Sequence, residues 1–177
     1  MKKLIPFEET PQTKKIQLQA SIETLKNSWW RAEFHLQGDL HKLQWPPASL
    51  VAPERRDLLW QNTCFEVFLS SGKSAQDPYF EINAAPQGDW NIYSLQAYRQ
   101  NLTVFQQGQI TVQSEMSPSK DQARVSVTLN ASFSSAPHFV GLTAVLQFQD
   151  GSLSYWALHH PHSEADFHDK RGFIVSL

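Results

Sequence analysis

The sequence predicts an all-β protein, an antiparallel β-sandwich of jelly-roll or immunoglobulin-like type with about ten strands and little helix. Three observations favour this fold class. Short segments alternate between apolar and polar residues, the breaks between them are rich in Gly, Asn, Asp and Pro, and no segment has the period of a usable amphipathic helix. A closed barrel is the main alternative.

Length and composition limit the domain organisation and the class of partner. The 177 residues suit one domain. We expect residues 1–13, with Pro6 and Pro11, to be an extended N-terminal arm rather than an element, and residues 14–177 to be a single β-sandwich domain. With 15 basic and 17 acidic residues and a net charge of −2, no nucleic-acid or membrane partner is expected. A single cysteine, Cys64, excludes an intramolecular disulfide framework.

The first third of the chain predicts two strands and a long connection. Residues 16–22 alternate, and residues 29–36 do so again with Trp30, Ala32, Phe34 and Leu36 on the inner side. Trp29 then faces outward, where it is either a stacking platform for a ligand or packs under a loop. Residues 38–58 contain Pro46, Pro47 and Pro53 and predict a connection, with a short strand at 40–45.

Residues 59–99 organise the rest of the chain, because they predict three neighbouring strands. The alternation in 63–70 and in 79–84, separated by a polar turn, predicts a hairpin, and the third strand is expected within 91–99. Glu81 and Asn83 share a face by the period of two. Glu66 joins them if Val67 and Ile82 both point into the core. We therefore predict that these three polar residues form the floor of the principal pocket, shielded by Trp60, Trp90 or Tyr79.

The remaining residues predict further strands and one turn of helix. Strands are expected at 103–105, 109–113 and 123–129, and a helical turn at 130–133. Residues 140–148 and 152–158 form a predicted hairpin about Asp150-Gly151. The last strand is expected at 172–177.

Several of these segments resemble one known family. Leu59 to Leu69, Tyr79 to Asn83 with Pro86 and Gly88-Asp89-Trp90, and His160-Pro161 with Asp166-Phe167-His168 are similar to the DOMON-like family related to family-nine carbohydrate-binding modules. The resemblance implies a β-sandwich with a binding site on or beside one sheet. The wider group holds sugar-binding modules, haem-binding cytochrome domains and members without a known ligand. It also implies that His160, Asp166 and His168 organise their loop, with the Asp fixing an imidazole tautomer.

The residue types around the central strands favour a small polar ligand, possibly a sugar. Sugar recognition needs flat apolar faces for the C–H side of the ring, and carboxylates, amides or guanidinium groups for its hydroxyls. Tyr93, Tyr98 and Gln96 add to this inventory. The residues that we expect to bind the ligand are Glu66, Glu81, Asn83, Trp60, Trp90, Tyr79, Arg99, His160, Asp166 and His168.

Other functions remain open from the sequence. The main alternative is a structural or protein-interaction domain without a small ligand. A haem-binding domain would need axial ligands, for which Met116 in a polar turn is a poor candidate. His159, His160, His162, Asp166 and His168 offer metal-ligand types without a specific spacing, so we expect no metal and no cofactor.

A glycoside hydrolase would use Glu66 and Glu81 as its carboxylate pair, but no catalytic residue can be assigned, and a binding protein is favoured over an enzyme. The loop Arg55-Arg56-Asp57 either holds a carboxylate or sugar hydroxyl or is a solvated turn. We expect the protein to be cytoplasmic, because the first residues lack the apolar run of a signal peptide and no apolar run is long enough to span a membrane.

Overall fold

The computed structural model of the chain describes residues 1–47, 52–131, 133 and 136–177, and within these ranges it is built almost entirely of antiparallel strands. The strands are β1 (Lys2–Pro6), β2 (Ile16–Thr24), β3 (Trp29–Gly38), β4 (Cys64–Ser70), β5 (Tyr79–Ala84), β6 (Trp90–Leu95), β7 (Thr103–Val104), β8 (Gly108–Met116), β9 (Gln122–Ala131), β10 (Phe139–Gln147), β11 (Leu153–Ala157) and β12 (Val175–Ser176). Four short 3₁₀ turns accompany them: η1 (Thr13–Lys15), η2 (Lys26–Ser28), η3 (Leu59–Gln61) and η4 (Lys170–Gly172). In the described ranges, no helix has the length and apolar character needed to cross a membrane. The predicted all-β class is confirmed.

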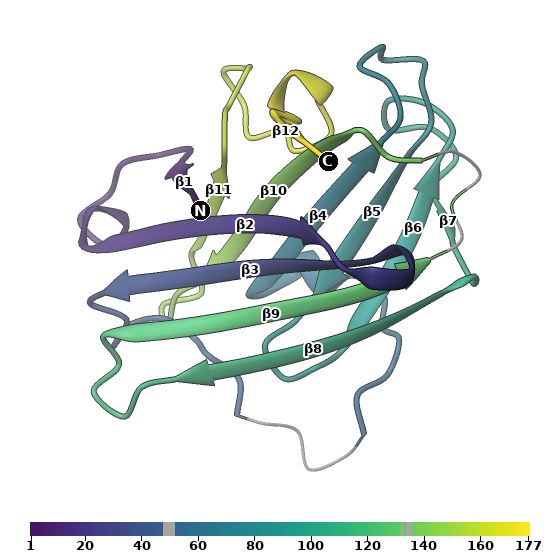
Figure 1. Cartoon of the computed structure of the whole chain (residues 1–177). Helices are drawn as coiled ribbons and strands as arrows, with labels where there is room; N and C mark the ends of the chain where they lie inside the picture. Colours follow the sequence, from purple (N-terminus) through teal and green to yellow (C-terminus); the bar gives the residue numbers. More distant parts are fainter. Residues whose placement is uncertain (48–51, 132, 134–135) are drawn as a thin grey trace.

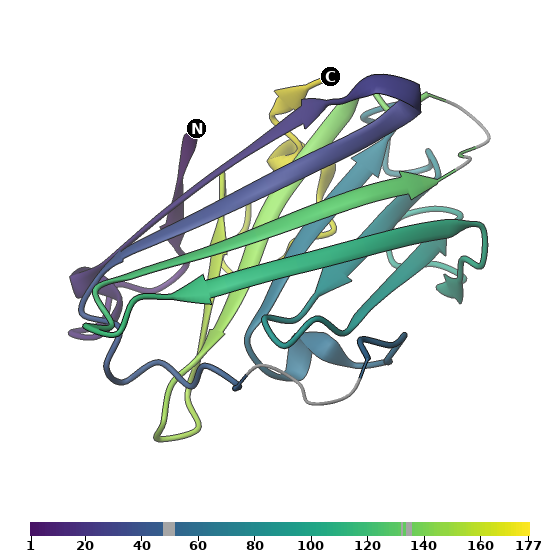
Figure 2. The same cartoon turned by 60° about the horizontal axis from the view of Figure 1, so that its bottom comes forward.

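The strands form two layers joined by β1. Sheet A holds β1, β2, β3, β9 and β8, and sheet B holds β7, β6, β5, β4, β10 and β11, with β12 paired to β10. In Figures 1 and 2 the long strands of sheet A cross in front of those of sheet B. The first part of β1 pairs with β2, and Ile5 and Pro6 pair with β11, so this strand passes from one layer to the other.

The expectation that residues 1–13 contain no regular element is therefore wrong for β1. Its apolar residues were too few to show an alternation, but Leu4 pairs with Leu18 of β2 and is fully buried between the layers. Pro6 lies at the end of β1, where the missing N–H disturbs the ladder least.

The core lies between the two sheets and has the predicted phase. The rings of Phe34 from β3 and Phe65 from β4 pack with their centroids 5.1 Å apart. Val67 and Ile82, which are directly paired between β4 and β5, are also fully buried in this cluster. Since both point inward, the neighbouring polar residues of β4 and β5 must face the other side of sheet B.

Three local expectations need correction. The predicted strand at 40–45 is reduced to a single bridge between Leu43 and Phe148, because the prolines that follow interrupt any longer pairing. The predicted helical turn at 130–133 is wrong at its start, since β9 continues through Ala131, while Ser132 lies outside the described residues. The last strand is only two residues long because η4 occupies the chain just before it.

Sheet B is unusual in being covered on both faces. All seven residues of β4 are buried. One face of β4 packs on sheet A, and the other lies beneath η3 and the segment 159–171, which follows β11. A strand buried on both sides usually carries only apolar residues, so the polar residues on the outer face of sheet B need a specific explanation.

Candidate functional site

The outer face of sheet B carries a row of polar residues that crosses four strands. The register pairs Asn91 of β6 with Asn83 of β5, Asn83 with Glu66 of β4, and Glu66 with Thr143 of β10. In the adjacent row, Glu81 lies between Tyr93 and Phe68. The prediction that Glu66, Glu81 and Asn83 share one face is confirmed.

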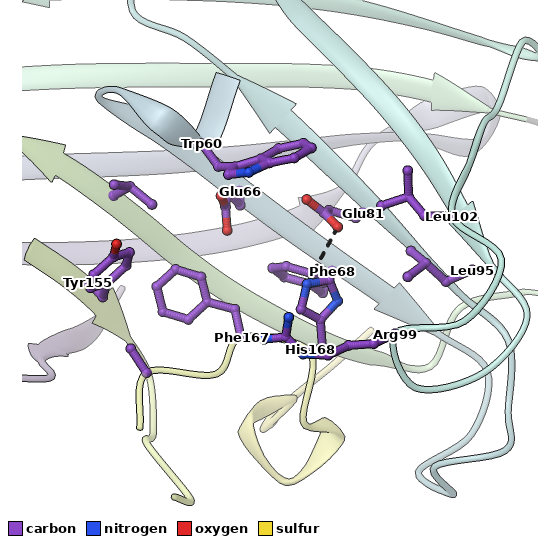
Figure 3. Close-up of a pocket in the computed structure, with 12 residues that line it drawn as sticks. Trp60, Glu66, Phe68, Glu81, Leu95, Arg99, Leu102, Tyr155, Phe167 and His168 are labelled. Atoms are coloured by element: carbon purple, nitrogen blue, oxygen red, sulfur yellow. Dashed lines mark ion pairs between the residues drawn. The ribbon is translucent and has the colours of Figure 1, made fainter. Parts of the chain in front are cut away.

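A pocket with a cavity volume of about 370 Å³ opens on this face. Figure 3 shows Glu66 and Glu81 pointing into it, with the ring of Trp60 on one side and His168 and Phe167 on the other. Its lining residues come from η3, from sheet B, from the loop after β6 and from the segment 159–171; they are Trp60, Glu66, Phe68, Glu81, Leu95, Arg99, Leu102, Val145, Tyr155, Ala165, Phe167 and His168.

Each carboxyl group is held through one oxygen. Thr143 Oγ1 donates to Glu66 Oε2 at 2.9 Å, and Asn83 Nδ2 donates to Glu81 Oε1 at 2.8 Å. The second oxygen of Glu81, Oε2, is buried and has no hydrogen-bond partner among the described residues. His168 Nε2 lies 4.0 Å from Glu81 Oε2 (Figure 3), and this distance is too long for a hydrogen bond.

Burial raises the pKa of both carboxyl groups. Glu66 is 2% exposed and Glu81 is 4% exposed. Loss of hydration disfavours the charged forms and is the main cause of each raised pKa, and for Glu66 the repulsion from Glu81 adds to it. The pKa of Glu66 rises to about 8. The pair therefore holds a proton at neutral pH.

His168 is neutral and its ring has a defined orientation. Burial lowers its pKa to about 4, with a further contribution from the charge of Arg99. The Tyr79 hydroxyl lies 2.7 Å from His168 Nδ1 and accepts from the backbone N–H of Arg99 at 3.2 Å. This contact fixes the orientation of the imidazole ring, with Nδ1 at the Tyr79 hydroxyl and Nε2 on the side of Glu81.

Asp166 links the loop after β6 to the segment 159–171 through hydrogen bonds. It is nearly buried and accepts from the Tyr98 hydroxyl at 2.5 Å, from Arg99 Nη2 at 3.0 Å and from the backbone N–H of His168 at 3.0 Å. The expectation that Asp166 fixes an imidazole tautomer is wrong for His168, since Asp166 accepts only from the His168 backbone, and the ring Nδ1 contacts the Tyr79 hydroxyl instead. Its hydrogen bonds nevertheless place both Arg99 and His168 at the pocket.

Two further residues anchor the segment 159–171 to the body of the protein. His160 Nε2 lies 3.0 Å from the carbonyl oxygen of Ile5 in β1, and its ring packs against Phe7 and Phe167. Lys170 is buried and donates to the backbone carbonyls of Ser74 and Asp77 in the loop between β4 and β5. The wall that carries Phe167 and His168 is therefore fixed at both ends.

The fold has a counterpart among solved structures. No family model matches the chain, and no curated protein sequence matches it significantly. A crystal structure of a candidate carbohydrate-binding protein from Bacteroides uniformis matches with a TM-score of 0.60 and 11% sequence identity, over 96% of this chain and 83% of that one. At such low identity the likeness shows the fold alone.

The structure brings together only some of the residues predicted from the sequence. Trp60, Glu66, Glu81, Arg99 and His168 line the pocket. Tyr79, Asn83, Asp166 and His160 lie behind this lining and support it through the contacts given above.

Trp90 and Trp29 do not lie at the pocket. Trp90 pairs with Ala84 on the inner side of sheet B, packs against the main core and lies under the guanidinium of Arg55. The alternation within β6 places Trp90 there, because Asn91 and Tyr93 pair with Asn83 and Glu81 on the outer face, so that Trp90 and Ile92 point inward. Trp29 belongs to β3 in sheet A, where it is partly buried opposite Asn130.

The arginine pair before η3 has structural partners. Arg55 donates to Asn91 Oδ1 and to the backbone carbonyls of Phe105 and Gly108. Arg56 forms ion pairs with Glu54 and with Asp89 at 3.0 Å or less. Neither arginine lines the pocket, so the expectation of a ligand-holding loop here finds no support from its geometry.

Sequence reasoning missed most of the apolar lining. Phe68 was predictable, because it has the parity of Glu66 on β4. Tyr155 and Val145 are directly paired on β11 and β10, and their place at the pocket follows only from the antiparallel contact of β10 with β4. Phe167 and Ala165 lie in an irregular segment, where no periodic signal exists.

The histidine-rich segment does not form a metal centre in the described residues. No group of three or more His, Cys, Asp or Glu side chains lies close enough there to hold a metal ion. His162 instead contacts Asp169 at 2.6 Å and Arg171 at 2.9 Å on the surface.

Proposed function

We propose that the protein binds a carbohydrate in the pocket on the outer face of sheet B. The observation that carries this proposal is the combination, in one open cavity of about 370 Å³, of aromatic side chains with two buried carboxyl groups, a guanidinium group and a neutral imidazole. Sugar rings need both kinds of surface, since their C–H faces are apolar and their hydroxyls donate and accept hydrogen bonds.

The aromatic side chains are held by the protein before any ligand arrives. Trp60 packs edge-on against Tyr93 with centroids 5.6 Å apart, and Phe68 packs in the same way against His168 at 5.4 Å. Phe167 packs against Tyr155 at 6.0 Å. Because these rings are already ordered, a sugar that stacks on Trp60 loses little binding free energy to their immobilisation.

The solved neighbour supports the carbohydrate class, since it is itself a candidate carbohydrate-binding protein of similar fold. A DOMON-like relationship to family-nine carbohydrate-binding modules is part of our proposal. So is a cytoplasmic location.

The test is a panel of mono- and disaccharides, with binding measured by isothermal titration calorimetry on the wild-type protein and on Glu81→Gln. The amide preserves the shape of the side chain and the hydrogen bond from Asn83, but removes a carboxylate oxygen that has no other partner. We expect the substitution to weaken the best sugar by about 1 to 3 kcal/mol while the melting temperature stays close to that of the wild type.

Glu115→Gln is the matched control, because Glu115 is an exposed residue of β8 that does not line the pocket. Its sugar affinity should equal that of the wild type. If no sugar binds, and Glu81→Gln instead lowers the melting temperature, the carboxyl group is structural, and a structural or protein-interaction domain becomes the better description.

A further inference from the structure

The buried polar atoms on the pocket face that lack partners are all hydrogen-bond acceptors. Glu81 Oε2 on the pocket lining and Asn83 Oδ1 behind it are both buried and have no hydrogen-bond donor among the described residues, and only the first belongs to a residue that lines the cavity. Glu81 as a whole is only 4% exposed and points into the cavity (Figure 3). An unpaired buried acceptor costs free energy, so a ligand that fits this place should bring hydrogen-bond donors.

The charged residues at the pocket also favour a ligand that donates hydrogen bonds. Glu66 and Glu81 are its two acidic residues, and they lie diagonally across the directly paired strands β4 and β5. Arg99 also lines the cavity, but its guanidinium is paired with Asp166 at 3.0 Å, whose charge offsets it. His168 is neutral, as argued above, and the charge of Arg99 acts on Glu81 only from a distance, so no protein cation in the described residues forms an ion pair with either carboxyl group.

We propose that the pocket takes a ligand with a protonated primary amino group, an amino sugar, whose ammonium is held between Glu66 and Glu81. This inference rests on the proposed carbohydrate function and narrows its ligand class. An ammonium has three N–H donors and no acceptor, which matches a site whose unused atoms are acceptors. The rings of Trp60 and Phe68 line the same cavity and attract a cation through their faces.

A ligand hydroxyl next to the amino group would also find a hydrogen-bond partner in the pocket, the imidazole of His168. His168 Nε2 lies 4.0 Å from Glu81 Oε2. Since a hydroxyl both donates and accepts, a sugar hydroxyl beside the ammonium can pair with Nε2 in either tautomer while the ammonium donates to the carboxylate. A simple alkylamine has no such hydroxyl, so the geometry favours an amino sugar over a polyamine.

Binding of the ammonium should release a proton. The raised pKa values of Glu66 and Glu81 mean that the empty pocket carries a proton that the cation displaces to solvent. Other titratable or charged groups also face this pair from the elements packed around it; they are Cys64 on β4, Tyr79 on β5, Tyr93 on β6, Tyr155 on β11, Arg99 in the loop after β6, and Asp166 and His168 in the segment 159–171.

The experiment is a calorimetric comparison of glucosamine, galactosamine and mannosamine with their neutral parent hexoses and their N-acetyl derivatives, with 1,4-diaminobutane as an amine that is not a sugar. It is run at about pH 6.5, below the usual pKa range of amino groups, in two amine-free buffers of different ionisation enthalpy. We expect one hexosamine to bind about tenfold or more tightly than its parent and its N-acetyl form, with proton release. Glu66→Gln and Glu81→Gln should each abolish that preference, and Glu115→Gln should retain it.

Each other outcome has a distinct meaning. If neutral sugars bind as tightly as their amino derivatives, the ammonium site is wrong and the carbohydrate function stands. If only 1,4-diaminobutane binds, and does so through both carboxyl groups, the cation site stands but the amino-sugar assignment and the carbohydrate function fail. If no amine binds to a wild-type protein that is folded, the inference is overturned.

Discussion

Replacing Phe65 by Ala should lower the free energy of unfolding by about 3 to 5 kcal/mol, the usual cost for a buried phenylalanine. Phe65 is fully buried between the sheets and packs against Phe34 and Trp45, with ring centroids 5.1 and 6.1 Å away. Truncation would leave a cavity that the strands of two hydrogen-bonded sheets cannot collapse to fill. Chemical denaturation followed by tryptophan fluorescence measures the loss.

Ile174→Ala is the control, because this residue is 42% exposed and lies in the C-terminal segment. Its effect should remain within about 0.5 kcal/mol. If Phe65→Ala costs less than about 1 kcal/mol, the strand phase of β4 is inverted, and Glu66 then faces the core instead of the pocket.

The stability of the ligand-free protein should fall as pH rises above neutrality. The folded-state pKa of Glu66 is about 8 against an ordinary value of 4.5, so the folded protein keeps a proton that the unfolded chain has already lost. This contribution is fully present below pH 4.5 and is lost as pH rises through about 8, by at most about 1.4 kcal/mol per pH unit. Glu81, whose pKa is also raised, acts with the same sign.

The difference between the wild type and Glu66→Gln from about pH 6.5 to 8 isolates this effect, because both proteins share the other titrating groups. His35, His160 and His168 have lowered pKa values, so their contribution has the opposite sign: it is complete above about pH 7.5 and is lost as pH falls through 6.5. Denaturant titrations of the wild type, Glu66→Gln and the surface control Glu115→Gln measure the slope. Glu66→Gln should flatten it, and Glu115→Gln should not. Equal slopes for the wild type and Glu66→Gln across this window would mean that Glu66 is ionised and solvated.

The sequence predicted which way side chains point where a regular strand packs one face on the core. The period of two placed Val67, Ile82, Glu66 and Glu81 on their observed faces, because register is strongly specified when one face packs on a core. It failed for β1, where the chain changes sheets after only a few residues. A strand of five residues that pairs with two different partners leaves too short a pattern to identify.

For the candidate site, the polar floor was predictable and the walls were not. Glu66 and Glu81 lie on regular strands, but Phe167 and His168 lie in an irregular segment whose position depends on Lys170 and Asp166. These anchors act between residues up to 96 positions apart, and no local pattern encodes them. Trp90 was misplaced because its aromatic character was given more weight than its parity on β6.

The most direct test of the central claim is to locate the ligand on the protein by nuclear magnetic resonance. The ¹⁵N-labelled protein is titrated with the tightest sugar from the panel, and amide and indole N–H shifts are recorded. We predict the largest changes at the Trp60 indole and at the amides of Phe68, Glu81 and His168, which surround the cavity. Changes confined to the outer face of sheet A, at Glu33, Arg124 and Ser126, would contradict a binding pocket on sheet B.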